Sequence, residues 1–282
     1  LQGAATLVGD TTAIMLGSYA DMSFLDFFWY KGRPGIFFAV ELGAVASALI
    51  LAWLFRKEKK PIDRATQLTP VTDYVPTVLL AGMIVLLISA SFLPSKPDIT
   101  NGLICVTLFV IGMVYTYVRT RKTEAFTGPI KSIDFETIGL LLGLFLVIGG
   151  ITHMGVVDAA AGLLARMGGG NVFLIYTVIV WASVLFSAFI DNIPYVATML
   201  PVVTGLASTL GIDPTLLYFG LLSGATLGGN MTPIGASANI AGIGILRREG
   251  YEVKTGDFCR IGIPFTLAAV IPAYIYFWVL FA

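Results

Sequence analysis

Asp191 is the residue in this sequence best suited to ion chemistry. It lies between two largely apolar arms, residues 172–190 and 195–210, and Asn192 follows it directly. An ionisable side chain at membrane depth is costly and marks a functional site. A partly dehydrated carboxylate there binds a cation such as Na⁺ or carries a proton. The alternative is a solvated turn in which Asp191 only caps the following helix.

A polar run interrupts a second apolar segment further along the chain. Residues 228–240 read GGNMTPIGASANI inside the apolar segment 214–246. Glycine and proline break helices, and a broken backbone exposed to lipid leaves N–H and C=O groups unpaired. The run is therefore either a water-exposed loop or an interrupted helix, buried in protein, where something polar binds. The candidate binding residues in this run are Gly229, Asn230, Thr232, Gly235, Ser237 and Asn239.

Oxygen atoms in and near this run suit a hard cation. Unwound carbonyl groups and the ends of half-helices hold Na⁺ in transporters. The residues that we expect at a Na⁺ site are Asp191, Asn192, Thr232 and Asn239. Helix N-termini near Thr12 and Asn239 would face an anion. In the alternative interpretation these polar groups only satisfy the broken backbone.

A second copy of the polar run begins the chain. Residues 3–14 read GAATLVGDTTAI and align with residues 229–240. Paired interruptions in two halves of a chain indicate the binding site of a secondary transporter, so Asp10, Thr11 and Thr12 become candidates too. Helix capping is the alternative role for Asp10, which stands opposite Ala236. The matched pairs are Gly3 and Gly229, Thr6 and Thr232, Gly9 and Gly235, Thr11 and Ser237, and Ile14 and Ile240.

The composition places these segments in a membrane. Of the 282 residues, 57% are hydrophobic and 12% are charged, with a mean hydropathy of +0.88, whereas soluble domains are about 25% charged. The net charge of zero gives no polybasic signal for nucleic acid. Cys105 and Cys259 lie in or beside apolar segments and indicate neither a disulfide framework nor a metal site. We expect no cofactor other than a coupling ion.

Apolar segments of about 20 residues identify the membrane spans. Residues 155–167 have a mild amphipathic pattern, and Glu41 either faces the protein interior or reaches water at the outer interface. Residues 1–56 would be the N-terminal repeat, 57–74 a charged linker and 75–282 the C-terminal repeat, with an interrupted helix at 214–246. Full spans are predicted at residues 34–55, 75–93, 99–118, 137–154 and 257–282.

The distribution of lysine and arginine orients these spans. Most of the 17 basic residues fall in three connections, and by the positive-inside rule residues 56–74, 119–134 and 247–260 are cytoplasmic. Residues 172–210 must then cross the membrane twice or not at all, and we favour a re-entrant hairpin that enters from outside. The spans at 34–55 and 257–282, which follow the two copies of the polar run and are matched to each other, then run in opposite directions, which is the inverted-repeat arrangement.

Three motifs carry a resemblance to a known group of proteins. They are TLVGDTTAIMLGS at residues 6–18, SAFIDNIPYVATMLPVV at 187–203 and GGNMTPIGASANI at 228–240. With them the chain resembles the ion transporter superfamily. The nearest branch contains arsenite permeases, pink-eyed-dilution-type proteins and sodium–proton antiporters, related to the citrate and dicarboxylate carriers.

The resemblance implies two inverted repeats, each with a re-entrant hairpin and a helix unwound at midmembrane, in a homodimer. One half-site would come from Asp191, Asn192 and residues 229–239, and half of its mirror image from residues 3–13. The matching first hairpin would lie upstream of Leu1, so we expect this chain to lack that N-terminal part. Dicarboxylate carriers have Ser-Asn-Thr where this chain has Asp191, Asn192 and Ile193, which argues against a dicarboxylate substrate.

These observations predict an all-α polytopic membrane protein that is a secondary transporter and not an enzyme. It would move a small anionic or oxyanionic solute, as arsenite permeases do, with Na⁺ or H⁺ as coupling ion, by alternating access in the inner or plasma membrane. Na⁺/H⁺ antiport and citrate or dicarboxylate transport are alternatives. An intramembrane aspartyl enzyme using Asp10 and Asp191 is a distant alternative, since neither aspartate has a Gly-x-Gly-Asp setting. A passive channel would need a continuous polar pore lining.

Overall fold

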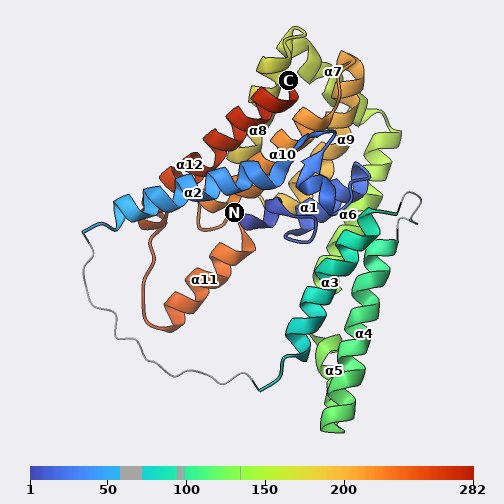
Figure 1. The fold of residues 1–282 in the computed structure, drawn as a ribbon. Coiled ribbons are helices and arrows are strands. Elements are labelled where there is room, and N and C mark those ends of the chain that lie inside the picture. Colours follow the sequence, from blue (N-terminus) through green and yellow to red (C-terminus); the bar gives the residue numbers. More distant parts are fainter. Residues whose placement is uncertain (58–71, 94–96, 98, 134) are drawn as a thin grey trace. The chain divides into compact units, whose positions relative to one another are not determined.

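The fold is almost entirely helical (Figure 1). The computed structural model describes residues 1–57, 72–93, 97, 99–133 and 135–282. The chain forms two compact units: the first contains residues 1–22, 26–58 and 141–282, and the second contains residues 23–25 and 59–140. Most of the charged linker predicted at 57–74 lies outside the described residues.

The N-terminal residues form short elements followed by one long helix. The 3₁₀-helix η1 (Gln2–Ala5) and helix α1 (Thr11–Tyr19) flank the first polar run. A further 3₁₀-helix, η2, covers Leu25–Phe27. Strands β1 (Trp29–Tyr30) and β2 (Arg33–Pro34) then form a short antiparallel ribbon. Helix α2 (Ile36–Leu54) follows and corresponds to the span predicted at 34–55.

The C-terminal part of the first unit is a series of helices broken at polar or glycine positions. Helix α6 (Phe135–His153) leads into it, with a bend of 70° at Gly155 before α7. The later elements are α7 (Val156–Gly168), α8 (Val172–Ser187), α9 (Asn192–Leu210), α10 (Thr215–Gly228), the 3₁₀-helix η3 (Gly229–Met231), α11 (Ser237–Arg248) and α12 (Thr255–Phe281).

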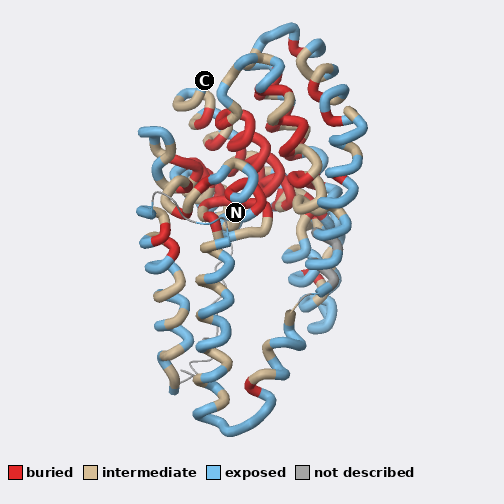
Figure 2. The backbone as a smooth tube through the Cα atoms, turned by 90° about the vertical axis from the view of Figure 1, so that its right-hand side faces the viewer, coloured by how far each residue is buried: buried red, intermediate tan, exposed pale blue. Residues whose placement is uncertain are grey.

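Helix α10 is the centre of the first unit, because all of its residues are buried. It packs against α8, α9 and α12, and Figure 2 shows the buried residues gathered in one region of the chain. Gly220, Gly224 and Gly228 recur at every fourth position, so they share one face. A Cβ atom at Gly224 would lie 2.7 Å from the carbonyl oxygen of Val180, and one at Gly228 would lie 2.7 Å from that of Val184. The glycine face therefore allows α8 to approach the backbone of α10.

Helices α2 and α12 also pack closely along their lengths (Figure 1). A Cβ atom at Gly43 would lie 2.6 Å from the carbonyl oxygen of Ala269. The Ser47 hydroxyl donates a hydrogen bond to the carbonyl oxygen of Phe265 at 2.8 Å. This pair joins the two elements that were matched as repeat-related spans.

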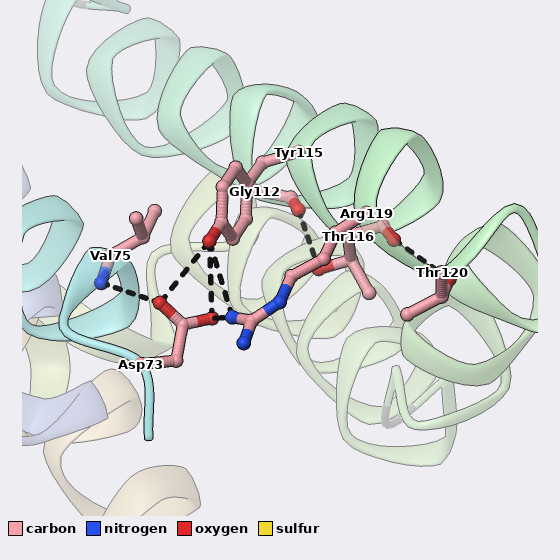
Figure 3. Close-up of polar contacts among 7 residues, drawn as sticks. All are labelled: Asp73, Val75, Gly112, Tyr115, Thr116, Arg119 and Thr120. Carbon is pink, nitrogen blue, oxygen red and sulfur yellow. Dashed lines mark hydrogen bonds and ion pairs between the residues drawn. The ribbon is translucent and has the colours of Figure 1, made fainter. Parts of the chain in front are cut away.

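The second unit contains helices α3 (Val75–Ser91), α4 (Thr100–Thr120) and α5 (Glu124–Lys131). Asp73 holds α3 to α4 (Figure 3). Its carboxylate accepts the N–H of Val75 at 3.0 Å and the Tyr115 hydroxyl at 3.2 Å, and it pairs with Arg119. The backbone hydrogen bond from Val75, followed by the charge and hydrogen bonds of its other partners, holds the pKa of Asp73 below its ordinary value despite some desolvation.

The fold class agrees with the prediction of an all-α polytopic membrane protein. Within the described residues, α2, α4, α9 and α12 are long and apolar enough to cross a membrane, and the bent pair α6–α7 is a fifth candidate. Helices α3 and α8 are apolar but shorter. The polar segment predicted at 119–134 contains helix α5, which the sequence interpretation had not placed there.

Candidate functional site

The first interruption of a helix lies between η1 and α1. The backbone is extended at Thr6 (φ −137°, ψ 156°) and again at Asp10 (φ −154°, ψ 153°). Gly9 donates its N–H to the carbonyl oxygen of Thr6 at 3.1 Å, and a Cβ atom at Gly9 would lie 2.5 Å from the carbonyl oxygen of Gly3. Helix α1 begins where the Asp10 side chain accepts the N–H of Thr12 at 3.0 Å, as an N-cap aspartate does.

The second interruption, between η3 and α11, has the same local geometry. Thr232 (φ −126°, ψ 162°) and Ala236 (φ −149°, ψ 142°) are extended. Gly235 donates its N–H to the carbonyl oxygen of Thr232 at 3.4 Å, and a Cβ atom at Gly235 would lie 2.6 Å from the carbonyl oxygen of Gly229. Residues aligned in the sequence therefore adopt matching conformations. Helix α11 starts without a side-chain cap, because Ala236 stands where the first copy has Asp10.

Two asparagine side chains support the second interruption. Asn239 donates its amide hydrogens to the carbonyl oxygens of Gly229 at 3.0 Å and Thr232 at 2.9 Å, and Asn230 donates to that of Leu227 at 3.0 Å. They satisfy part of the backbone that the break leaves unpaired. The carbonyl oxygen of Thr232 also accepts the N–H of Gly235, and that of Leu227 also accepts the N–H of Gly229, so the protein itself uses both lone pairs of these two oxygens. Asn230 and Asn239 also line a cavity of about 280 Å³ together with residues of α2 and α12.

Two hydroxyl groups fasten the segment between α8 and α9 to this region. The Ser187 hydroxyl at the end of α8 donates to the carbonyl oxygen of Ala225 in α10 at 2.5 Å. The Thr232 hydroxyl donates to the carbonyl oxygen of Ala188. Ser187 and Thr232 are buried. The end of α8 and the residue after it are therefore held by α10, which precedes the second interruption, and by Thr232, which lies within it.

Asp191 begins helix α9. Its Oδ1 atom accepts the N–H of Ile193 at 2.9 Å, so the helix starts at Asn192, three residues before the predicted second arm at 195–210. Asp191 is half-buried. It therefore caps a helix, as the alternative interpretation expected, and still has its second oxygen available for another partner.

Two hydrogen bonds bring three helix N-termini together. Ser237, the first residue of α11, donates its hydroxyl to Oδ2 of Asp191 at 3.3 Å. Asn192, the first residue of α9, donates its amide to Oδ2 of Asp10 in a long hydrogen bond of 3.5 Å. Each carboxylate thus uses one oxygen for its own helix and the other for a donor from a different element. The positive dipole ends of α1, α9 and α11 therefore lie beside two carboxylates.

Thr12 links this arrangement to the buried core. Its hydroxyl lies 3.0 Å from the hydroxyl of Thr226 in α10, and the two residues are only 0% and 9% exposed. The same residue holds the Asp10 carboxylate through its backbone N–H. Thr12 therefore acts as a structural contact between α1 and α10, while Thr11 is half-buried at the first position of α1.

The charges around Asp10 and Asp191 are unbalanced. Among the described residues, the two ion pairs are Lys31 with Asp213 at 2.5 Å and Arg119 with Asp73. Within the described residues neither Asp10 nor Asp191 forms an ion pair with lysine, arginine or histidine, although the amino group of Leu1 interacts with the charge of Asp10. No group of three or more histidine, cysteine, aspartate or glutamate side chains suitable for a metal occurs in the described part of the chain. The predicted Na⁺ site at Asp191, Asn192, Thr232 and Asn239 stays a prediction.

The structure adds residues that sequence reasoning missed. Thr226 and Ser187 hold the interrupted segments in place, but each is one hydroxyl in an apolar helix and carries no sequence signal. Gly220, Gly224 and Gly228 of α10 do carry a sequence signal, because their four-residue spacing is typical of closely packed membrane helices.

Comparison with known proteins identifies relatives along the whole chain. A "46 kDa membrane protein" of Mycobacterium leprae is 30% identical over 280 residues, covering 98% of this chain and 64% of its own length. An uncharacterized transporter of Mycobacterium tuberculosis is 31% identical over 283 residues with the same coverage. The chain thus spans less than two-thirds of these relatives. The P protein of Homo sapiens is 35% identical over 139 residues, 47% of this chain and 17% of that protein.

A family model described as "Citrate transporter" matches residues 1–219 and 102–282, and these two matches together cover the chain. They include both interrupted segments and the segment between α8 and α9. The chain therefore belongs to the citrate transporter family.

Proposed function

We propose that this protein is a secondary transporter that couples the movement of a small anionic or oxyanionic solute to Na⁺ or H⁺. The observation that carries the proposal is the pair of hydrogen bonds from Ser237 to Asp191 and from Asn192 to Asp10. They place two carboxylates and three helix N-termini around one region. Membership of the citrate transporter family and relatives named as transporters support the same function.

The charges of the site provide a reason for coupling. Two carboxylates that form no ion pair with lysine or arginine among the described residues repel an anion, and this repulsion is strong where water is scarce. A bound Na⁺ or proton removes that repulsion. The N-termini of α1, α9 and α11 then attract the anion, since helix N-termini present unpaired N–H groups and a partial positive charge. The solute would therefore bind only after the coupling ion, which prevents uncoupled leakage.

The matching conformations of the two interruptions support an inverted-repeat transporter. In this proposal the two repeats rearrange around the site to expose it alternately to each side of the membrane. Residues 56–74, 119–134 and 247–260 would face the cytoplasm, α8 and α9 would form the re-entrant hairpin, and the functional unit would be a homodimer in the inner or plasma membrane.

Na⁺/H⁺ antiport is a second candidate, favoured by the absence of a lysine or arginine ion pair at Asp10 and Asp191 among the described residues. A carboxylate pair can exchange a proton for Na⁺ without an anionic solute. Citrate or dicarboxylate transport rests on the family description alone, and the aspartate at the hairpin tip argues against it.

Flux in proteoliposomes tests the proposal. The full-length protein would be tested with arsenite, citrate and succinate under imposed Na⁺ and pH gradients, as wild type and as Asp191→Asn. Asp158→Asn, an exposed carboxylate on α7, is the matched control. The proposal predicts solute flux that follows a cation gradient and is lost only in Asp191→Asn. Na⁺/H⁺ exchange without any solute would favour the second candidate, and cation-coupled flux through Asp191→Asn would contradict both.

A further inference from the structure

Glu41 lies in an apolar groove that the proposed transport site does not include. Phe38, Glu41, Leu42 and Val45 recur at three- and four-residue intervals on α2, so they share one helix face. This face lines a groove with a volume of about 530 Å³. Glu41 is half-buried, and among the described residues it has no hydrogen-bond or ion-pair partner.

Two of the segments that line the groove are joined at the start of α2. Tyr276 of α12 donates its hydroxyl to the carbonyl oxygens of Pro34 at 3.0 Å and Gly35 at 3.3 Å. Trp29 is opposite Pro34 in the β1–β2 ribbon. The Tyr276 hydroxyl is thus held at the start of α2, strand pairing holds the backbone of Trp29 beside Pro34, and Phe38 is a third aromatic residue of the lining. Trp29 is 57% and Phe38 is 41% exposed, so both rings are open to a ligand.

The chemistry of the groove selects one class of ligand. An ionised carboxylate in apolar surroundings is costly unless a positive charge pairs with it. Aromatic faces attract cations as well as apolar groups, and this is how proteins recognise quaternary ammonium ligands. The volume falls within the range of about 300–1,000 Å³ that small-molecule sites occupy. An anion or a neutral acyl chain would leave Glu41 unpaired.

We infer that this groove binds a small lipophilic organic cation, with its charged centre beside Glu41 and its apolar groups between Trp29, Phe38 and Tyr276. The site uses none of the residues of the proposed transport site. The inference therefore stands or falls independently of the transported solute and of the coupling ion.

Tetraphenylphosphonium is a suitable probe, because tetraphenylborate has the same shape and the opposite charge. Binding of each radiolabelled ion would be measured by equilibrium dialysis against the full-length protein in nanodiscs of phosphatidylcholine, with empty nanodiscs subtracted. The variants are Glu41→Gln and Phe38→Ala. The matched control is Glu249→Gln, which makes the same chemical change at the exposed end of α11.

The inference predicts that Glu41→Gln weakens tetraphenylphosphonium binding by at least about tenfold, in line with the strength of desolvated cation–π and charge contacts. Glu249→Gln should leave the affinity unchanged, and tetraphenylborate should bind the wild type poorly. Phe38→Ala should weaken binding by about three- to tenfold through the lost ring, which gives a result even if Glu41→Gln does not fold.

Three results would overturn the inference. Equal affinity of wild type and Glu41→Gln would remove the role of the carboxylate. Equal binding of the phosphonium and the borate, both weakened by Phe38→Ala, would identify an acyl-chain groove. No phosphonium binding above empty nanodiscs would mean that lipid or a second copy of the chain covers the face.

Discussion

Replacing Thr226 by valine should loosen the contact between α1 and α10. In the wild type the buried Thr12 hydroxyl lies 3.0 Å from the Thr226 hydroxyl. Valine keeps the shape of threonine but leaves the Thr12 hydroxyl without this hydrogen bond. In soluble proteins an unsatisfied buried group costs about 1–3 kcal/mol. Hydrogen bonds between membrane helices average only about 0.6 kcal/mol, because the unfolded chain in a membrane also finds partners. We therefore expect a loss of about 0.5–1.5 kcal/mol in the free energy of unfolding.

Unfolding by sodium dodecyl sulfate in mixed micelles measures this loss. The series is Thr226→Val, Thr12→Val and the double variant, with Thr226→Ser as the control that keeps the hydroxyl. Removing both hydroxyls leaves none unpaired, so the double variant should cost less than the sum of the single variants, by about 0.5–1 kcal/mol. Strictly additive single variants, or a serine variant as unstable as the valine variant, would refute the hydrogen bond.

Two further predictions concern packing and charge. Gly224→Ala should lower the free energy of unfolding by about 1–3 kcal/mol through overpacking, since its Cβ atom would meet backbone of α8. A Cβ atom at Gly242 would meet no other atom within 4 Å, so Gly242→Ala should be neutral or stabilising in the same unfolding by sodium dodecyl sulfate. Partial burial would raise the pKa of Asp213, but hydrogen bonds from Lys31 and from Thr215 at its own helix start hold that pKa below its ordinary value. The ion pair therefore contributes its whole stabilisation at pH values above the ordinary aspartate pKa. This contribution is lost as the pH falls through the lowered pKa of Asp213 in the folded protein. Both side chains are more than half exposed, so the effect should stay below about 1 kcal/mol. The melting temperatures of the wild type and Asp213→Asn should converge on acidification. A constant difference in melting temperature down to about pH 2, well below the ordinary aspartate pKa, would count against the ion pair.

Much of the fold was predictable because local sequence determines it. Apolar runs of span length became α2 and α12, and the polar residues at 228–240 produced the break between α10 and α11. The alignment of the two polar runs predicted a second interruption near the start of the chain, and the structure has one there, with glycine and extended residues at matching positions. Helix α5 was missed because its eight residues include a glycine and a proline, which both disfavour helix.

The contacts that assemble the candidate site were not predictable from one sequence. Asn192 and Asp10 are 182 positions apart, and Ser237 and Asp191 are 46 apart. No periodicity relates such residues, because their meeting depends on how whole helices pack. The partner of Thr12 is likewise set by the close approach of α1 to α10. Sequence therefore identified the chemical groups, and packing decided which of them meet.

Cation binding measured without transport tests the central claim most directly. Calorimetric titration of the purified full-length protein with Na⁺ at two pH values reports both the Na⁺ affinity and the protons released. The account predicts that Asp10→Asn and Asp191→Asn each weaken cation binding by at least about tenfold, by analogy with other paired charges in sparsely hydrated sites, and that the double variant binds none, while Asp158→Asn behaves as wild type. Wild-type Na⁺ affinity and proton release in both single variants would contradict it.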